Sequence, residues 1–323
     1  MTQWMICSKV LSHLMASRFR LMNSQYTHVL KNIQPIIDAP DEDRIYFLQE
    51  EKWIPYSLAK DVLARMDSLM KYPRKSRMPS MLLVGETNNG KTSILNKFLH
   101  LHPPLSNEDA VETTKIRVIS IQAPPGGNLN ELYTNILKQF AVPYKNTDKI
   151  AKKQQQVEYY FGLCQLKILI IDEIHNILSA PTAKQTIFMN TLKTLSNTLQ
   201  ISIIIAGTKD ALYATNTNTQ INNRFKPVFL PKWQLDREYL ALLASIESTL
   251  PLKKASNLAS SKKMAQKILD LTEGYIGEMF DLITLSAEYA IKNKVEQITL
   301  DTIKKSGYIK PSLRKSFDDM VQL

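Results

Sequence analysis

The sequence predicts an α/β protein, in which a parallel sheet covered by helices on both faces is followed by an all-helical domain. Short apolar runs of strand length alternate with helical patterns through the first two thirds of the chain. The runs are apolar at nearly every position, which is typical of strands buried on both faces of a parallel sheet. From about residue 232 onward, helical patterns continue without strands.

The predicted core begins with helical spacing of apolar residues over 44–70, where Pro55 and Ser57 precede a longer helix from near Leu58. Residues 81–84 form a strand-sized apolar run. A helix follows, and its apolar positions are Ile94, Leu95, Phe98 and Leu99.

Further strands are predicted where β-branched or alternating apolar runs occur, and helices where apolar residues recur at three- and four-residue intervals. The strands are 115–121, 167–173 and 201–206, and the helices are 129–140 and 187–199. Three segments lack such patterns: 123–128 is expected to be a loop, 145–156 a polar and basic segment, and 227–233 a connector. Beyond the connector, helices are expected at 235–250, 262–272, 276–291 and 300–305.

A chain of 323 residues is long enough for two domains. We expect an N-terminal arm over 1–50, an α/β core over 51–231, a helical domain over 232–310 and a tail over 311–323. Met22 is an alternative start, which would make residues 1–21 a loosely ordered extension.

Composition limits the class of partner. The net charge of +11 and the pI near 9.4 favour a polyanion such as nucleic acid, although basic composition alone does not establish one. The two cysteines, Cys7 and Cys164, are far apart and lack metal-ligand spacing, so a reducing cytoplasm is expected. No apolar run approaches the roughly 18 residues that span a bilayer, and no membrane partner is expected.

Residues 85–92 read GETNNGKT, which fits the phosphate-loop pattern G-x-x-x-x-G-K-[ST] between a strand and a helix. Backbone N–H groups of such a loop surround a β-phosphate, Lys91 reaches the β- and γ-phosphates, and the Thr92 hydroxyl ligates Mg²⁺. The alternative is a glycine-containing surface turn, which the flanking strand and helix disfavour. The predicted nucleotide-binding residues are Gly85, Glu86, Thr87, Asn88, Asn89, Gly90, Lys91, Thr92 and Ser93.

Two consecutive acids end the run KILIIDE at 167–173. Because ligands of parallel sheets bind at the carboxyl ends of strands, these acids are expected beside the phosphate loop. Asp172 would hold Mg²⁺ through water, and Glu173 would accept a proton from the water that attacks the γ-phosphate. The alternative is a strand that ends in solvated acids. His175 lacks a second ligand at i+4 and is interpreted as a capping or packing residue.

Two polar residues follow the last predicted strand. Thr208 in AGTKD either contacts the attacking water or γ-phosphate, or serves as a turn or cap residue. Arg224 lies between that strand and the connector, where a guanidinium could neutralise transition-state charge on a γ-phosphate, including that of a neighbouring subunit.

Four segments together resemble the TniB/TnsC family of transposition AAA+ ATPases, in the family's order and spacing over roughly residues 44–290. The more specific features are NNGKT in the loop, AGT after the fourth strand, and RF followed by LPxW before the lid. The segments are RMPSMLLVGETNNGKTSILNKF (77–98), ILIIDEIHNIL (168–178), IIIAGTKDAL (203–212) and INNRFKPVFLPKW (221–233).

The resemblance implies an AAA+ P-loop NTPase core with a parallel sheet and a helical lid, using ATP and Mg²⁺. It also implies rings or helical filaments, with six or seven subunits per turn, on duplex DNA near the bacterial nucleoid. Its implied partners are a transposase and a TniQ-type targeting protein, or a CRISPR effector that carries one. It gives Lys91 and Thr92 the Walker A roles, Asp172 and Glu173 the Walker B roles, Thr208 the sensor-1 role and Arg224 the role of an arginine finger.

The chain departs in the lid, where many AAA+ proteins carry a sensor-2 arginine and this chain has Glu278 and Met279, which is consistent with slow hydrolysis. DNA contacts are expected on backbone phosphates, although an ordinary solvated surface is the alternative for each lysine. The candidate DNA-binding residues are Lys115, Arg117, Lys149, Lys152 and Lys153. Two other functions remain open: a replication-initiator or helicase-loader ATPase, and a nucleotide-gated scaffold in which hydrolysis is incidental.

Overall fold

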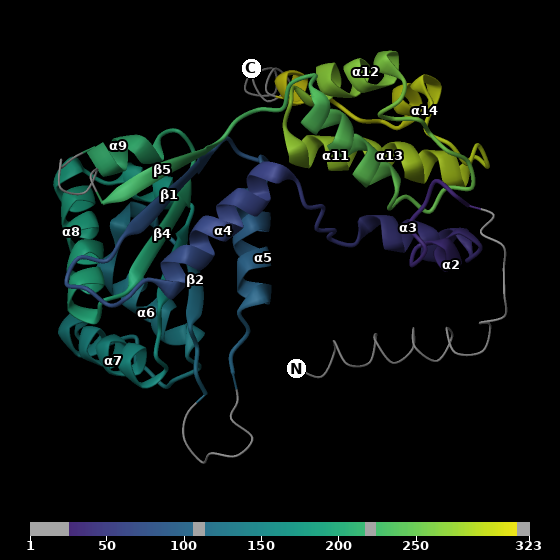
Figure 1. Ribbon diagram of the computed structural model, residues 1–323. Coiled ribbons are helices and arrows are strands. Elements are labelled where there is room, and N and C mark those ends of the chain that lie inside the picture. The colour runs from purple at the N-terminus through teal and green to yellow at the C-terminus, as the bar shows by residue number, and fades with distance from the viewer. Residues whose placement is uncertain (1–25, 106–113, 217–223, 315–323) are drawn as a thin grey trace.

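The computed structural model describes residues 26–105, 114–216 and 224–314, and contains a five-stranded sheet in the order β2-β3-β4-β1-β5 (Figure 1). All its strand pairs are parallel. The strands are β1 (Ser80–Gly85), β2 (Val118–Gln122), β3 (Ile168–Asp172), β4 (Ser202–Gly207) and β5 (Phe225–Leu230). The predicted parallel α/β core is therefore confirmed.

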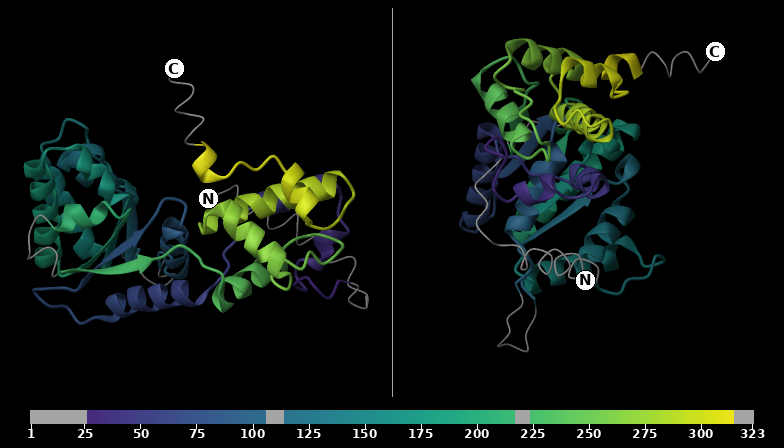
Figure 2. Two further views of the ribbon diagram at one scale, coloured as in Figure 1. Left: turned by 90° about the horizontal axis from the view of Figure 1, so that it is seen from above. Right: turned by 90° about the vertical axis from the view of Figure 1, so that its right-hand side faces the viewer.

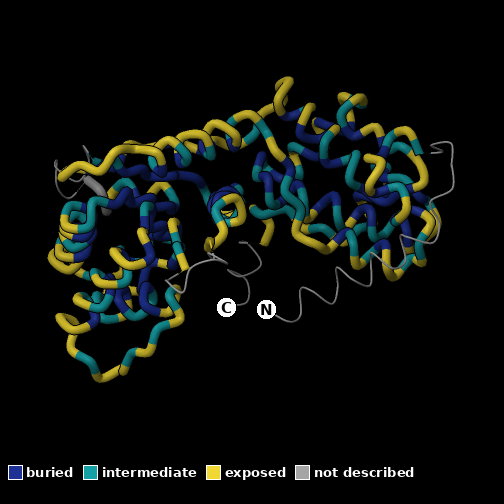
Figure 3. Tube along the Cα trace, turned by 60° about the horizontal axis from the view of Figure 1, so that its bottom comes forward, coloured by how far each residue is buried: buried dark blue, intermediate teal, exposed yellow. Residues whose placement is uncertain are grey.

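Helices cover both faces of the sheet, because alternate residues of each strand point to opposite sides. Strand residues such as Leu169 and Ile203 pack with helices α6 to α8, whereas Ile170 and Ile204 pack with α4 and α5. The three central strands β3, β4 and β1 are consequently buried along their length (Figure 3), whereas the edge strand β5 alternates buried and exposed residues. The core helices are α4 (Ser57–Lys71), α5 (Lys91–Leu101), α6 (Leu129–Gln139), α7 (Ile150–Leu163), α8 (Thr182–Leu199) and α9 (Ala211–Asn216), with short 3₁₀ turns η1 (Pro125–Gly127) and η2 (Ile174–Ser179).

One sequence expectation about the core is wrong and another is incomplete. The expected connector at 227–233 begins as strand β5, which lies at the edge of the sheet and pairs only with β1. Pro227 is tolerated there because an edge strand has a side without ladder hydrogen bonds. The expected polar segment at 145–156 contains the start of helix α7, whose buried stripe consists of Lys153, Val157 and Phe161. Because Lys153 occupies a buried position, the apolar spacing that would indicate a helix is incomplete in the sequence.

The helical domain stands beside the core (Figure 2). Its helices share one apolar cluster, which also includes Leu48 and Ile54 from the segment before the core. That N-terminal segment therefore packs on the helical domain. The helices of the domain are α11 (Arg237–Glu247), α12 (Lys262–Thr272), α13 (Ile276–Lys292) and α14 (Leu300–Lys305), and the N-terminal segment adds α2 (Gln34–Ile37) and α3 (Asp41–Gln49). Ile37 of α2 lies in a small separate cluster with Val29 and Ile33. Among the described residues, no helix is both long and apolar enough to cross a bilayer.

A buried ion pair joins α3 to the loop before α14. The guanidinium of Arg44 is 1% exposed, donates to both carboxylate oxygens of Glu296 and to the Pro251 carbonyl oxygen, and contacts Asp41 at 3.4 Å. Burial alone would raise the pKa of the Glu296 carboxyl, but the hydrogen bonds and charge of Arg44 outweigh it and lower the pKa.

Glu296→Gln is expected to lower the free energy of unfolding by about 3–5 kcal/mol, because it leaves the buried Arg44 charge with only the longer contact to Asp41. Asp301→Asn, which breaks the exposed Asp301–Lys305 pair, should change it by less than about 1 kcal/mol. Urea denaturation of both variants measures this. Since the pKa of Glu296 is depressed in the folded state, the pair's contribution is present above the unfolded carboxyl pKa and is lost as the pH falls through the folded one. Equal stabilities of both variants at pH 7 would contradict the assignment.

Candidate nucleotide-binding site

The predicted nucleotide-binding residues lie together at the carboxyl ends of the strands. Strand register places Val84 beside Gly207 and Gly85 beside Leu230, so the phosphate loop follows β1 at the edge where β4 and β5 also end. Strand β3 ends at Asp172 on the same edge. Thr208 therefore lies at the loop's edge of the sheet as well.

The loop closes onto the first turn of α5, whose N-cap Gly90 has φ +81°, a conformation that favours glycine. The ammonium of Lys91 lies within the loop and donates to the carbonyl oxygens of Gly85 and Glu86, both at 2.9 Å. Burial lowers the pKa of Lys91, while the negative charges of Glu173, Asp172 and Glu86 oppose that shift. A buried cation beside α5's N-terminus is suited to bind a phosphate oxygen.

Oxygen ligands for a cation meet where the loop faces β3. The Thr92 hydroxyl donates to Asp172 Oδ2 at 2.7 Å, and this carboxylate is 6% exposed. A hydroxyl and a carboxylate at this separation suit Mg²⁺, which prefers oxygen ligands and retains water. In the described part of the chain, no group of three His, Cys, Asp or Glu side chains gathers as an alternative metal site.

Glu173 stands beside this pair with a backbone φ of 55°. Such a conformation costs a non-glycine residue about 1 kcal/mol, and it turns the chain into η2 directly after the acids. Nε2 of His175 lies 3.0 Å from a carboxylate oxygen of Glu173. His175, interpreted from sequence as a packing residue, is thus a direct partner of the predicted catalytic base.

The lid touches the phosphate loop through the first turn of α13. The Gly277 N–H donates to the Asn88 carbonyl oxygen at 3.0 Å, and Asn88 Nδ2 donates to Glu278 Oε1 at 3.0 Å. A Cβ on Gly277 would lie 1.8 Å from Asn88 Oδ1, so glycine permits this approach. Glu278 at the start of the lid helix α13 thus contacts the phosphate loop through Asn88.

An arginine from the C-terminal segment compensates Glu278. Arg314 donates to both Glu278 oxygens, at 3.1 and 2.7 Å, and the Tyr308 hydroxyl donates at 2.7 Å. Burial would raise the pKa of Glu278, but these bonds and that of Asn88 lower it overall. Sequence reasoning missed Arg314 because residues 311–323 show no strong pattern; only the folded chain returns this arginine to the lid.

A cavity of about 760 Å³ adjoins the loop and extends under the lid. Its volume lies within the range of small-molecule sites, and its lining combines aromatic and apolar side chains with polar groups from the loop. Residues that sequence reasoning did not assign include Trp53, Tyr56, Ile276 and Phe280. Tyr56 also packs edge-on against Trp233, with ring centroids 5.1 Å apart. The cavity can accommodate a nucleotide base and ribose next to the phosphates.

Arg314→Ala is expected to weaken ATP affinity by about threefold to tenfold, because it leaves a nearly buried carboxylate uncompensated beside the phosphates. Titration with a fluorescent ATP analogue measures the dissociation constant. Lys310→Ala, which removes a longer 3.8 Å contact to Glu273, is the matched control and should change it less than twofold. An unchanged affinity for Arg314→Ala would show that the Glu278 charge does not reach the nucleotide.

Thr208 and Glu86, both predicted from the sequence to lie in the nucleotide site, have partners within the chain. The Thr208 hydroxyl lies 3.5 Å from Asp210, as a turn residue would, and remains at the edge of the nucleotide site. The neighbouring Lys209 forms an ion pair with Glu86 of the loop at 3.0 Å. Thr208 can therefore serve in either of the roles considered from the sequence.

Arg224 lies at the opposite, amino-terminal ends of the strands. It comes immediately before β5, whose Phe225 pairs with Ser80 at the start of β1. The six residues of β1 separate it from its own phosphate loop by roughly 20 Å at about 3.3 Å per residue. Its guanidinium donates to the Lys193 carbonyl oxygen and to Asn197 Oδ1. It therefore lies too far from the phosphate loop of its own chain to contact a nucleotide there.

The candidate DNA-binding residues differ in accessibility. Arg117, Lys149 and Lys152 are exposed and Lys115 is half-buried, whereas Lys153 is 1% exposed. The Lys153 ammonium donates to Asn130 and Thr134 side chains at 2.8 and 2.9 Å and to a backbone carbonyl oxygen. A DNA contact by Lys153 is therefore wrong, because its charge is buried and satisfied between α6 and α7.

Comparison with known proteins gives a family and a fold. The model of the family described as "Bacterial TniB protein" matches residues 44–235. No curated protein sequence matches the chain. The solved structures include Cdc6p from Pyrobaculum aerophilum, with 16% identity, a TM-score of 0.58, and coverage of 83% of this chain and 70% of that one.

The Aeropyrum pernix ORC2 protein in its ADPNP–ADP complexes is 15% identical, with a TM-score of 0.57 and coverage of 81% and 71% of the two chains. The Aeropyrum pernix ORC1 protein in complex with DNA is 11% identical, with a TM-score of 0.55 and coverage of 81% and 68%. At these identities the likeness concerns the fold, which is that of AAA+ ATPases with a helical C-terminal region.

Proposed function

The chain belongs to the TniB family, and from that premise we propose that it is an ATPase that assembles on duplex DNA, selects a target site and recruits a transposase. One observation carries the proposal. The phosphate loop, Asp172 and Glu173 lie at the carboxyl ends of the strands, and Arg224 lies at their amino ends. A site divided in this way is complete only between two copies of the chain, which couples nucleotide binding to assembly.

The residues support a mechanism for hydrolysis. When bound by Thr92 and Asp172, Mg²⁺ would neutralise charge on the β- and γ-phosphates. Glu173 accepts a proton from the water that attacks the γ-phosphorus, while the bond between that phosphorus and the bridging oxygen breaks and ADP leaves. Lys91 holds the phosphate oxygens on the same subunit. Arg224 of the adjacent subunit stabilises the charge that develops in the transition state.

DNA is the proposed polyanionic partner. Arg117 and Lys149 are exposed, Lys115 is half-buried, and Lys152 is exposed but paired with Asp148. An oligomer would repeat these cations in every copy, so that weak backbone contacts add together. Two proteins of this fold are described as bound to DNA: the Aeropyrum pernix ORC1 protein and the Drosophila ORC. We further propose the transposase subunits and a TniQ-type targeting protein, alone or with a CRISPR effector, as protein partners in the bacterial cytoplasm.

Negative-stain images of the protein with ATP and linear duplex DNA test the proposal. Rings or filaments on the DNA are expected for the wild type. Lys91→Ala should bind neither nucleotide nor DNA as an assembly, because it removes the cation from the phosphate loop. Dispersed monomers of the wild type under these conditions would contradict the proposal.

Two alternatives are separated by further measurements. A nucleotide-gated scaffold predicts that DNA leaves the single-turnover rate of ATP hydrolysis unchanged, whereas an active regulator predicts a change. The Cdc6-like and ORC-like fold is compatible with an initiator as well. Binding of a purified transposase subunit to the DNA-bound assembly supports the transposition function, and binding of a replicative helicase in its place would favour the initiator.

A further inference from the structure

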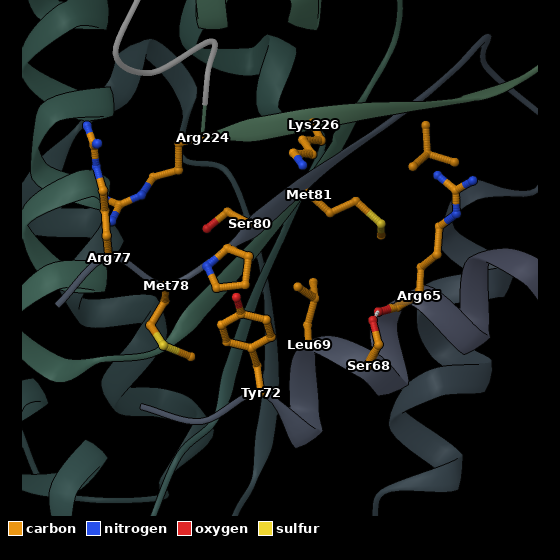
Figure 4. Close-up of a pocket in the computed structure, with 12 residues that line it drawn as sticks. Arg65, Ser68, Leu69, Tyr72, Arg77, Met78, Ser80, Met81, Arg224 and Lys226 are labelled. Carbon is orange, nitrogen blue, oxygen red and sulfur yellow. Dashed lines mark hydrogen bonds between the residues drawn. The ribbon is translucent and has the colours of Figure 1, made fainter. Parts of the chain in front are cut away.

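A second cavity, of about 360 Å³, opens at the amino-terminal edge of the sheet, away from the phosphate loop (Figure 4). Its walls come from the second half of α4, the segment 72–79 and the starts of β1 and β5. Four cationic side chains surround it, with Arg77 and Arg224 side by side at one end. The four are Arg65, Arg77, Arg224 and Lys226.

The positive charges of this cavity are not balanced within the described part of the chain. No carboxylate lines the cavity, and none of its four cations forms an ion pair with a described residue. Burial and then the nearby charge of Arg77 lower the pKa of Arg224. Holding like charges together opposes folding of the isolated chain, and an external anion would relieve that repulsion.

The two arginines keep hydrogen-bond donors available. Arg224 uses one N–H of each terminal nitrogen, for the Lys193 carbonyl oxygen and for Asn197. A guanidinium has five donors in a planar fork, so several remain on Arg224. Arg77 is exposed and makes no hydrogen bond with the described residues. Both can therefore bind phosphate oxygens without losing an ion pair.

The carboxyl edge of the same sheet supplies the complementary charge. Glu86, Asp172 and Glu173 gather there around the phosphate loop, and a bound triphosphate adds further negative charge. Because the acidic edge and the basic cavity lie at opposite ends of one sheet, the two surfaces meet only between copies arranged head to tail. Such a heterologous contact generates rings or filaments.

We propose that this cavity is the docking site for the nucleotide-bearing edge of a second copy, and that Arg77 acts beside Arg224 as a second arginine on that copy's phosphates. The inference rests on the proposed function and extends it. Arg224 is fixed by Asn197 and a carbonyl oxygen, whereas Arg77 is free to follow the γ-phosphate. Each copy thus contributes two guanidinium groups, rather than one, to the neighbouring nucleotide site.

Arg77→Ala tests the proposal, with Arg74→Ala as the matched control, since Arg74 is an exposed arginine of the same segment that does not line the cavity. Arg77→Ala should lower kcat at saturating protein by about tenfold or more, with the affinity for a fluorescent ATP analogue unchanged. Arg77→Lys should restore part of the rate, because it retains the charge but not the fork. Arg74→Ala should remain within twofold of the wild type.

A mixing experiment tests action between copies. Glu173→Gln keeps Arg77 but lacks the base, whereas Arg77→Ala keeps the base. A 1:1 mixture should recover roughly a quarter of the wild-type rate, because about one interface in four then pairs an intact base with an intact arginine. A rate equal to the sum of the two separate variants would overturn action between copies.

The outcomes distinguish this inference from the proposed function. If Arg224→Ala loses activity while Arg77→Ala does not, only the role of Arg77 is overturned. If Arg77→Ala and Arg74→Ala both lower DNA affinity and leave the DNA-free rate unchanged, the segment binds DNA and the inference is overturned. If the wild type neither assembles nor hydrolyses ATP, the proposed function itself fails.

Discussion

Arg224→Ala is expected to lower the rate of ATP hydrolysis in the assembled protein by on the order of 10³, because it removes the charge that stabilises the transition state across the subunit boundary. Nucleotide affinity of the unassembled chain should remain within about threefold of the wild-type value, since Arg224 is roughly 20 Å from its own phosphate loop. Steady-state hydrolysis at several protein concentrations, with titration of a fluorescent ATP analogue, measures both quantities.

The control for this variant is Arg237→Ala, which removes an exposed arginine at the first position of α11. It should leave the rate within twofold of the wild type. Arg224 also contacts Asn197, so thermal melting of Arg224→Ala must accompany the kinetics to separate a lost charge from local unfolding. A folded Arg224→Ala protein that hydrolyses ATP at the wild-type rate would refute catalysis between subunits.

Glu173→Gln is expected to lower hydrolysis by about 10²- to 10⁴-fold, because the amide cannot accept the proton of the attacking water. ATP binding should persist, since the Lys91 and Thr92–Asp172 contacts remain. The assembly on DNA should therefore outlast that of the wild type after free ATP is removed. Single-turnover hydrolysis and timed images of DNA-bound particles measure these effects.

Glu131→Gln is the matched control, because Glu131 is an exposed carboxylate in the first turn of α6. It should hydrolyse ATP at the wild-type rate and dissociate on the same schedule. Normal hydrolysis by Glu173→Gln would mean that another group activates the water. His175 would then be the next residue to replace, since its Nε2 lies 3.0 Å from the Glu173 carboxylate.

The predictable parts of the fold follow from local pattern. Residues 81–84 and 168–171 are apolar at every position, and β1 and β3 form at these runs. Helices α12 and α14 begin and end where the apolar spacing predicts. The less regular β5 and α7 were not predicted, because an edge strand with Pro227 and a helix with a buried Lys153 violate the usual patterns.

The placement of polar groups depended on contacts between distant segments. In the sequence Lys153 resembles any other basic residue. In the structure it is buried, and its ammonium donates hydrogen bonds to oxygen atoms of residues 7 to 23 positions away in the chain. Arg314 lies in a segment without pattern, yet it pairs with Glu278, 36 positions earlier. Periodicity reports which face of an element is apolar, and it carries no information about which distant partner satisfies a polar side chain.

The sequence by itself determined the parallel α/β core, the helical domain and the family, because strand runs and the phosphate-loop motif are encoded in adjacent residues. Only the tertiary structure decided that Arg224 and Arg77 share a basic cavity, that Glu278 docks on Asn88, and that the segment before the core packs on the helical domain. These arrangements depend on which elements pack together, because burial and charge pairing act through space rather than along the chain.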